Sequence, residues 1–185
     1  MKAVYILIIL VVVMIGAYSA YGTLAKKASA EKQPPAAAPA APAGPAEKAP
    51  DFTVTGQNGD KVSFSSMLGK PVIVNIWATW CGPCKMELPD FQEASQKYSD
   101  RITFMMVNLT SGDETVDTVR KFLRENSYTF PVYFDTEQSA DGAYQVTGIP
   151  TTIFIDAEGN IVSKQIGMLD REELQAGIDR LLAAR

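Results

Sequence analysis

The chain has 185 residues, of which 46% are apolar, and its formal net charge at pH 7 is −4. It contains two cysteines and no histidine, which excludes histidine-based general base catalysis, histidine metal ligands and haem attachment through Cys-x-x-Cys-His. From residue 51 onward, 12 Lys and Arg stand against 19 Asp and Glu, with no basic run, and this net charge of −7 disfavours nucleic acid as a partner.

The N-terminal segment is apolar. Residues 3–25 contain no charged side chain, and as a helix they can span a hydrocarbon core of about 30 Å. We therefore expect a signal anchor, a single transmembrane helix, at residues 1–25. A cleaved signal peptide is the alternative, because Lys2 precedes the apolar run and small residues suited to cleavage follow it. Lysines on both sides of the segment leave its orientation open.

A segment rich in Ala and Pro follows, at residues 26–50. Repeated proline prevents a continuous helix and favours an extended polyproline II chain with a reach of about 3.1 Å per residue. We expect this segment to be a linker between the membrane and a globular domain at residues 51–185.

The globular part begins with strand patterns. Short apolar runs at residues 52–54 and 62–64 flank a glycine-containing turn and predict a β-hairpin. Ser65 is expected to cap a short turn after it. The near-continuous apolar run at residues 71–77 is typical of a central strand covered on both faces. A helix is then expected at residues 83–98.

The second half continues this alternation of strands and helices up to the C-terminus. The expected elements are strands at 102–107 and 132–134, helices at 114–125, 139–144 and 170–182, and a hairpin of 151–156 with 161–166. The implied fold is α/β, with a central mixed sheet, helices on both faces and an N-terminal β-hairpin.

Cys81 and Cys84 stand where the apolar strand gives way to a helix, with Pro83 in its first turn. The spacing puts both sulfurs on one helix face, at the end where unpaired N–H groups and the macrodipole stabilise a thiolate. We expect Cys81 to attack and Cys84, one turn deeper, to resolve the mixed disulfide. A zinc site would need further ligands, and a disulfide across so small a loop would stabilise little. The pattern thus predicts a redox-active disulfide, without metal or cofactor.

These residues carry a resemblance. The segment Val74 to Lys85, with Trp80-Cys81-Gly82-Pro83-Cys84, resembles the active-site segment of the thioredoxin superfamily, and Gly148-Ile149-Pro150-Thr151 is similar to its cis-proline loop. The likeness extends from residue 49 to the C-terminus. The anchor, the Pro50-Asp51-Phe52 opening and Lys85-Met86-Glu87-Leu88-Pro89 resemble the TlpA/ResA branch of extracytoplasmic thiol-disulfide oxidoreductases, which includes reductases of cytochrome c maturation.

The resemblance implies a catalytic role for Glu87. Thioredoxin has a buried aspartate on the strand before the motif, where this chain has Asn75, which cannot titrate. Glu87 lies three residues after Cys84, and side chains at that spacing share a helix face. By resemblance, Glu87 is the proton acceptor for Cys84 and modulates the pKa of Cys81. The alternative is a surface glutamate on a solvated helix face.

The resemblance also implies a substrate-binding surface. Pro150 is expected to follow a cis peptide bond that presents the backbone of Ile149 near Cys81, where an extended substrate segment would pair with it. Trp80 is the expected apolar contact beside the nucleophile, whereas Trp77 is expected in the core.

The function implied is that of a protein-disulfide reductase, as Gly82-Pro83 matches reducing thioredoxins. The substrate would be a protein disulfide such as that of apocytochrome c. The enzyme would be a single-pass protein of the cytoplasmic membrane, with its catalytic domain on the extracytoplasmic face and a membrane thiol-electron donor as partner. The alternatives are a disulfide-donating oxidase, a non-catalytic binding module and a peroxiredoxin-like peroxidase. In the last family a Thr or Ser precedes the cysteine by three residues, where this chain has Ala78.

Overall fold

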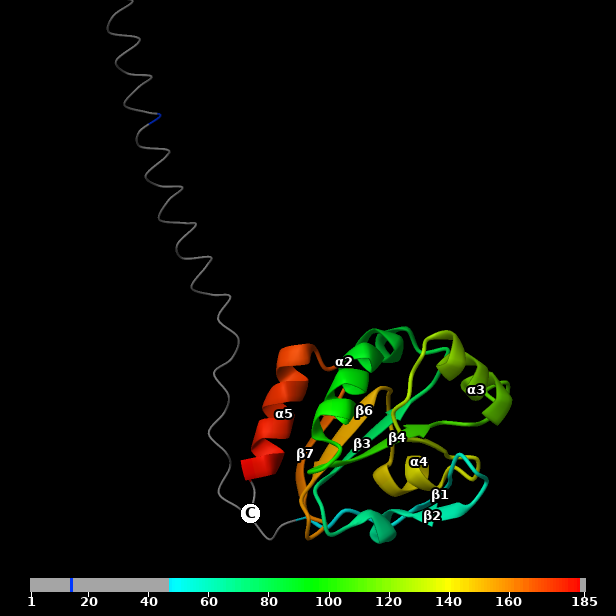
Figure 1. Ribbon diagram of the computed structural model, residues 1–185, viewed down its shortest axis with the longest axis horizontal. Helices are drawn as coiled ribbons and strands as arrows, with labels where there is room; N and C mark the ends of the chain where they lie inside the picture. The colour runs from blue at the N-terminus through cyan, green and yellow to red at the C-terminus, as the bar shows by residue number, and fades with distance from the viewer. Residues whose placement is uncertain (1–13, 15–46, 184–185) are drawn as a thin grey trace, which may run out of the picture. The chain divides into compact units, whose positions relative to one another are not determined.

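The computed structural model describes residue 14 and residues 47–183. Within the latter range, seven strands form one sheet in the order β2-β1-β5-β4-β3-β6-β7 (Figure 1). In chain order the elements are β1 (Thr53–Thr55), β2 (Lys61–Ser63), the 3-10 helix η1 (Phe64–Met67), β3 (Val72–Trp77), α2 (Gly82–Tyr98), β4 (Thr103–Asn108), α3 (Val116–Glu125), β5 (Val132–Phe134), α4 (Ser139–Tyr144), β6 (Thr151–Ile155), β7 (Ile161–Ile166) and α5 (Arg171–Ala183).

The sheet is mixed. Strand β3 pairs in parallel with β4 and antiparallel with β6, and β6 continues into the antiparallel hairpin partner β7. The N-terminal hairpin of β1 and β2 joins the other side through an antiparallel pairing of Thr55 with Phe134 in β5. All six residues of β3 are buried, as expected for an apolar strand at the centre of a covered sheet.

Helices cover both faces of the sheet, which confirms the predicted α/β architecture. Alternate residues of β3 point to opposite faces, so Ile73 and Trp77 join the apolar cluster under α2, α3 and α5. Val74 and Ile76 join the opposite cluster, under η1 and α4. Figure 1 shows α2 and α5 side by side on the first of these faces. Asn75 lies between Ile73 and Trp77 in the strand and therefore faces α2.

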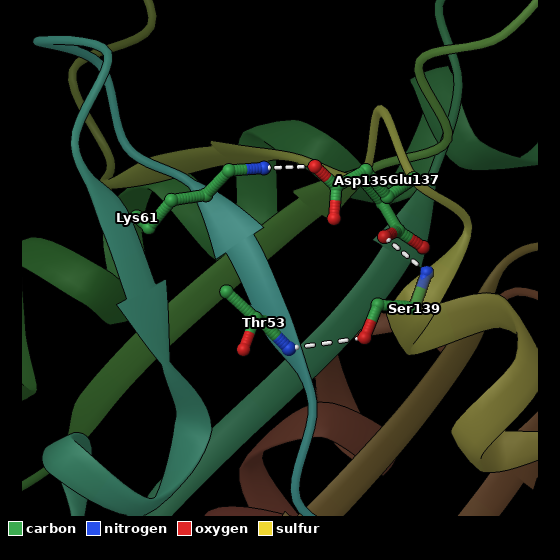
Figure 2. Close-up of polar contacts among 5 residues, drawn as sticks. All are labelled: Thr53, Lys61, Asp135, Glu137 and Ser139. Carbon is green, nitrogen blue, oxygen red and sulfur yellow. Dashed lines mark hydrogen bonds and ion pairs between the residues drawn. The ribbon is translucent and has the colours of Figure 1, made fainter.

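Polar contacts fasten the N-terminal hairpin to α4 (Figure 2). The N–H of Thr53 donates to the hydroxyl of Ser139, whose own N–H donates to Asp135, and Lys61 forms an ion pair with Glu137. Asp135 is buried, and its second oxygen accepts from the N–H of Asp141. Its carboxylate thus satisfies two N–H groups in the first turn of α4 that have no partner within the helix.

One predicted cap was wrong by two residues. Ser65 lies inside η1, and the residue that caps η1 is Ser63, whose hydroxyl accepts from the N–H of Ser66 at 3.3 Å. The strand β2 ends at Ser63, so the same residue closes the strand and begins the 3-10 helix.

The chain enters the domain beside β7. The N–H of Ile161 donates to the carbonyl of Glu47, and the N–H of Ala49 donates to the carbonyl of Gly159. Among the residues that the structure describes, no helix has the length and apolar character needed to cross a membrane. The predicted anchor at residues 1–25, apart from Met14, and linker residues 26–46 lie outside the described residues. Both segments stay predictions.

Candidate active site

The two cysteines form a disulfide at the start of α2. Cys81 is the N-cap of the helix, in an extended backbone conformation, and its sulfur accepts from the N–H of Cys84 at 3.1 Å. Pro83, which needs no hydrogen-bond partner for its nitrogen, occupies the first turn. Cys81 is 4% exposed, whereas Cys84 is fully buried. A sulfur at the N-cap receives N–H donors that favour its thiolate, and it is the more accessible of the pair.

The loop before β6 approaches Cys81 from the side. The Ile149–Pro150 peptide bond is cis, as the resemblance implies, and the carbonyl oxygen of Ile149 lies 3.7 Å from the sulfur of Cys81. The hydroxyl of Thr151 donates to the carbonyl of Gly148, and the N–H of Gly167 donates to the carbonyl of Pro150. These bonds fix the backbone of the loop beside the nucleophile.

Glu87 lies in the interior under α2, and the surface interpretation is therefore wrong. It is 1% exposed. The side-chain amide of Asn75 donates to one of its oxygens at 2.7 Å, and the N–H of Leu169 donates to the other at 2.9 Å. Burial raises the pKa of Glu87 to about 7; the bonds from Leu169 and Asn75 oppose the rise, and the charge of Asp90 adds to it. Glu87 can thus exchange a proton near neutral pH.

A second buried glutamate, Glu114, holds the loop between β3 and α2. One of its oxygens accepts from the N–H of Thr79 at 2.6 Å and from the side chain of Asn108 at 2.9 Å. The other accepts from the hydroxyl of Thr79 at 2.6 Å. Sequence reasoning missed this group because Glu114 precedes the N-cap Thr115, and nothing in its spacing connects it with a residue 35 positions earlier.

A few large apolar side chains are exposed to solvent. Within residues 47–183, the large apolar side chains with high exposure are Trp80, Met86, Ile166 and Met168. Trp80 and Met86 are near the two cysteines in the chain. Ile166 and Met168 flank Gly167, which donates to the carbonyl of Pro150. Trp77, by contrast, is buried with Phe122 and Phe130. Trp80 is thus an exposed apolar side chain adjacent to Cys81 in the chain, and Ile166 pairs with Thr151 beside the cis-proline loop.

The chemistry open to this site is thiol-disulfide exchange. It combines a disulfide at a helix N-terminus, a cis-proline loop beside Cys81 and a buried carboxylate three residues after the second cysteine. Within residues 47–183, no three Cys, Asp or Glu side chains are grouped so that they could hold a metal ion.

Comparisons with known proteins agree with this chemistry. A model of the AhpC/TSA family matches residues 45–164. Thioredoxin-like protein YneN of Bacillus subtilis (strain 168) is 33% identical over 133 residues, 72% of this chain and 78% of that protein. Thiol-disulfide oxidoreductase ResA of Bacillus anthracis is 33% identical over 135 residues, 73% of this chain and 77% of that protein.

Solved structures give the same result. The crystal structure of StoA from Bacillus subtilis superposes with a TM-score of 0.61 at 30% sequence identity, over 76% of this chain and 99% of that chain. Relatives named thiol-disulfide oxidoreductases also include the sporulation thiol-disulfide oxidoreductase A of Bacillus subtilis (strain 168), 32% identical over 118 residues, 63% of this chain and 71% of that protein. The chain therefore belongs to the AhpC/TSA family and is a thioredoxin-like thiol-disulfide oxidoreductase.

Proposed function

We propose that this enzyme works as a reductase of protein disulfides, with Cys81 as nucleophile, Cys84 as resolving thiol and Glu87 as proton acceptor. The observation that carries the proposal is the placement of Glu87, buried on the inward face of α2 one turn after Cys84 and with its pKa raised to about 7. A resolving thiol that is itself buried needs a nearby group to take its proton before it can attack.

The reaction begins with the reduced enzyme. The Cys81 thiolate attacks one sulfur of the client disulfide; a Cys81–client disulfide forms, the client disulfide breaks, and the other client sulfur leaves as a thiolate. Cys84 then gives its proton to the Glu87 carboxylate and attacks the sulfur of Cys81. The Cys81–Cys84 disulfide forms and the second client thiolate is released. Two electrons pass from the enzyme to the client, whose thiolates take up protons.

The client segment would lie in extended form along the Gly148 to Pro150 loop. The exposed apolar side chains of Trp80, next to Cys81, and of Ile166, which pairs with Thr151 after the loop, suit a partly unfolded polypeptide with apolar side chains beside its disulfide. Apocytochrome c is the client we propose, because the TlpA/ResA branch that the sequence resembles includes reductases of cytochrome c maturation.

The location we propose is the extracytoplasmic face of the cytoplasmic membrane, with a single anchoring helix at residues 1–25. Disulfides persist outside the cytosol, so clients for a reductase are found there. Each catalytic cycle leaves the Cys81–Cys84 disulfide, and a membrane protein that carries electrons on thiols is the partner proposed to reduce it again. Labelling of a cysteine introduced at the exposed Ser111, in intact cells with a membrane-impermeant maleimide, tests the location. Absence of labelling until the cells are opened would contradict it.

Trapping tests the client and the mechanism together. Full-length Cys84→Ser is expected to accumulate mixed disulfides through Cys81, because the resolving attack is lost. The trapped proteins, released with dithiothreitol and identified, are expected to include apocytochrome c. The double variant Cys81→Ser/Cys84→Ser is the matched control and is expected to trap none. If the single variant also traps none, the proposed attack of Cys81 on a protein disulfide is wrong, and binding without exchange would be the better account of that client surface.

The direction of electron flow is tested separately. Gly82-Pro83 between the cysteines favours a stable disulfide and a reducing enzyme, so equilibration with a dithiothreitol redox series is expected to give a low potential. A strongly oxidising potential would favour the disulfide-donating oxidase. A peroxidase of the peroxiredoxin type would have a Thr or Ser hydroxyl at position 78, where this chain has the buried, apolar Ala78. Peroxide consumption by the purified protein, without an added peroxidase, would revive it.

A further inference from the structure

Asn75 joins Glu87 to the neighbouring strand β6. It is fully buried in β3, and its side-chain nitrogen donates to Glu87 at 2.7 Å and to the hydroxyl oxygen of Thr152 in β6 at 3.0 Å. An ionised carboxylate only accepts hydrogen bonds, so when Glu87 is ionised the amide must turn its nitrogen toward it, as the structure shows. The bond to Thr152 then fixes the amide in that orientation.

The other half of the amide is left without a partner. The side-chain oxygen of Asn75 is buried and has no hydrogen-bond partner among the described residues. A buried polar atom without a partner is unfavourable, and an apolar side chain of the same size would avoid it. The contribution of Asn75 therefore lies in its N–H donors rather than in filling space.

We propose that Asn75 is a positioning residue, which holds the Glu87 carboxylate on the inward face of α2 where the Cys84 proton is released. The proposal rests on the proposed role of Glu87 as proton acceptor and explains how a carboxylate in an apolar layer keeps one orientation. Leu169 fixes the second oxygen through its backbone, so Asn75 is the side chain through which substitution can release the carboxylate.

The charged groups near Glu87 are few. On α2 they are Cys84, once reduced, and Asp90, whose charge acts on Glu87. From α5, Arg171 pairs with Asp90 at 2.7 Å. Strands β3 and β6 contribute the uncharged Asn75 and Thr152, and the segment before α5 contributes the N–H of Leu169. An altered titration of Glu87 in an Asn75 variant can thus be assigned to the lost donor.

An aspartate at this position would act differently. It would place a second carboxyl at hydrogen-bond distance from Glu87, and two such groups share a proton and titrate in coupled steps. Asparagine gives the same shape with a donor in place of a charge, so that Glu87 titrates as a single group.

The test uses the full-length chain with Asn75→Leu, Asn75→Asp and Thr152→Val. The titration of the Glu87 carboxyl is followed by carbon NMR in the oxidised enzyme. Asn75→Leu is expected to raise the midpoint by about one pH unit, since one donor to the ionised form is lost. Thr152→Val, which keeps the shape of the threonine, is expected to raise it by a smaller amount. Asn75→Asp is expected to give two steps, the upper one above the wild-type midpoint.

The matched control is Asn108→Leu. Asn108 is also a buried asparagine on a central strand that donates to a buried glutamate, in its case Glu114. Its loss is expected to lower stability without moving the Glu87 midpoint. The proposal is overturned if Asn75→Leu and Thr152→Val both titrate as the wild type does, or if Asn108→Leu shifts Glu87 equally.

A kinetic measurement separates this proposal from the proposed function. The resolving step, measured as release of a mixed disulfide preformed on Cys81, is expected to accelerate with pH around the Glu87 midpoint. In Thr152→Val that acceleration should move up with the midpoint. If the midpoint moves while the kinetic profile does not, Asn75 still positions Glu87, and it is the role of Glu87 as proton acceptor that fails.

Discussion

Two buried glutamates contact the segment that carries the disulfide: Glu114 bonds to Thr79, before the cysteines, and Glu87 follows them on α2. The two carboxylates differ in their hydrogen-bond donors. Glu114 accepts three hydrogen bonds, two of them from Thr79. Glu87 is buried slightly more deeply and accepts one bond on each oxygen, from Asn75 and Leu169. Glu114 fixes a loop, whereas Glu87, with its pKa near 7, is available for proton transfer. The two carboxylates thus differ in the number of donors they accept from and in the segments they join.

The largest effect is expected from removing Glu114. Glu114→Ala leaves the partly buried N–H of Thr79 and the buried amide of Asn108 without their acceptor, and the loss of three hydrogen bonds should cost about 3 kcal/mol or more. Urea unfolding of the oxidised enzyme measures this loss. The control Glu125→Ala, at an exposed position of α3, is expected to stay within about 0.5 kcal/mol of the wild type. If both variants lost the same unfolding free energy, Glu114 would have no special structural role.

Glu87 should appear instead as a pH dependence of stability. Its pKa in the folded protein, about 7, lies above its ordinary value of 4.5, so the folded chain keeps a proton that the unfolded chain has lost between these pH values. The contribution of neutral Glu87 to the free energy of unfolding is greatest below about pH 4.5. It decreases as the pH rises toward 7, and the total loss is about 3 kcal/mol.

The measurement is the difference in unfolding free energy between the wild type and Glu87→Gln across this pH range. The variant cannot ionise, so the difference should change with pH and level off above about pH 7. Glu114→Gln is the comparison variant and should keep the dependence that comes from Glu87. A difference that is constant with pH would show that Glu87 does not titrate in this range.

A smaller effect is expected at the loop. Thr79→Val keeps the backbone bond to Glu114 and loses only the hydroxyl donor, so it should cost about 1 kcal/mol in urea unfolding. Combined with Glu114→Ala, it should add almost nothing further, because the bond it removes is already gone. Additive losses would mean that the two residues act independently.

The smallest effect concerns the charge next to Glu87. Asp90→Asn removes a negative charge that raises the pKa of Glu87, but burial is the larger cause. The Glu87 midpoint, followed by carbon NMR, is therefore expected to fall by less than about half a unit. A fall of more than half of the rise from 4.5 to about 7 would make Asp90, rather than burial, the main cause of the raised pKa.

Local patterns in the sequence predicted most of the fold. The apolar run of β3, the glycine turns of the hairpins and the helical spacing of α3 each report on neighbours close in the chain. The spacing on one helix predicted that Cys81 and Cys84 act together and that Glu87 shares their helix face, with resemblance supplying the roles, whereas the burial of Glu87 came from the structure. The N-cap at Ser63 was missed because two nearby serines can each offer a hydroxyl, and only the backbone geometry chooses between them.

What could not be predicted depends on contacts between distant segments. Glu114 meets Thr79 across 35 residues, Asn75 meets Thr152 across 77, and Leu169 meets Glu87 across 82. No periodicity in a single sequence records such pairs. Asn75 was recognised only as a residue that cannot titrate, and its function as a donor emerged from the pairing of β3 with β6 and the packing of α2 above them.

The contact of Glu47 and Ala49 with the turn between β6 and β7 has a mechanical consequence. Since β6 runs antiparallel to β3, that turn lies at the end of the sheet where β3 starts, and the disulfide lies beyond the opposite end. A force applied to the chain at residue 47 would therefore act on the backbone hydrogen bonds of Glu47 with Ile161 and of Ala49 with Gly159, at the end of the sheet remote from the sulfurs. These two bonds therefore hold the start of the domain at the end of the sheet that is remote from Cys81 and Cys84.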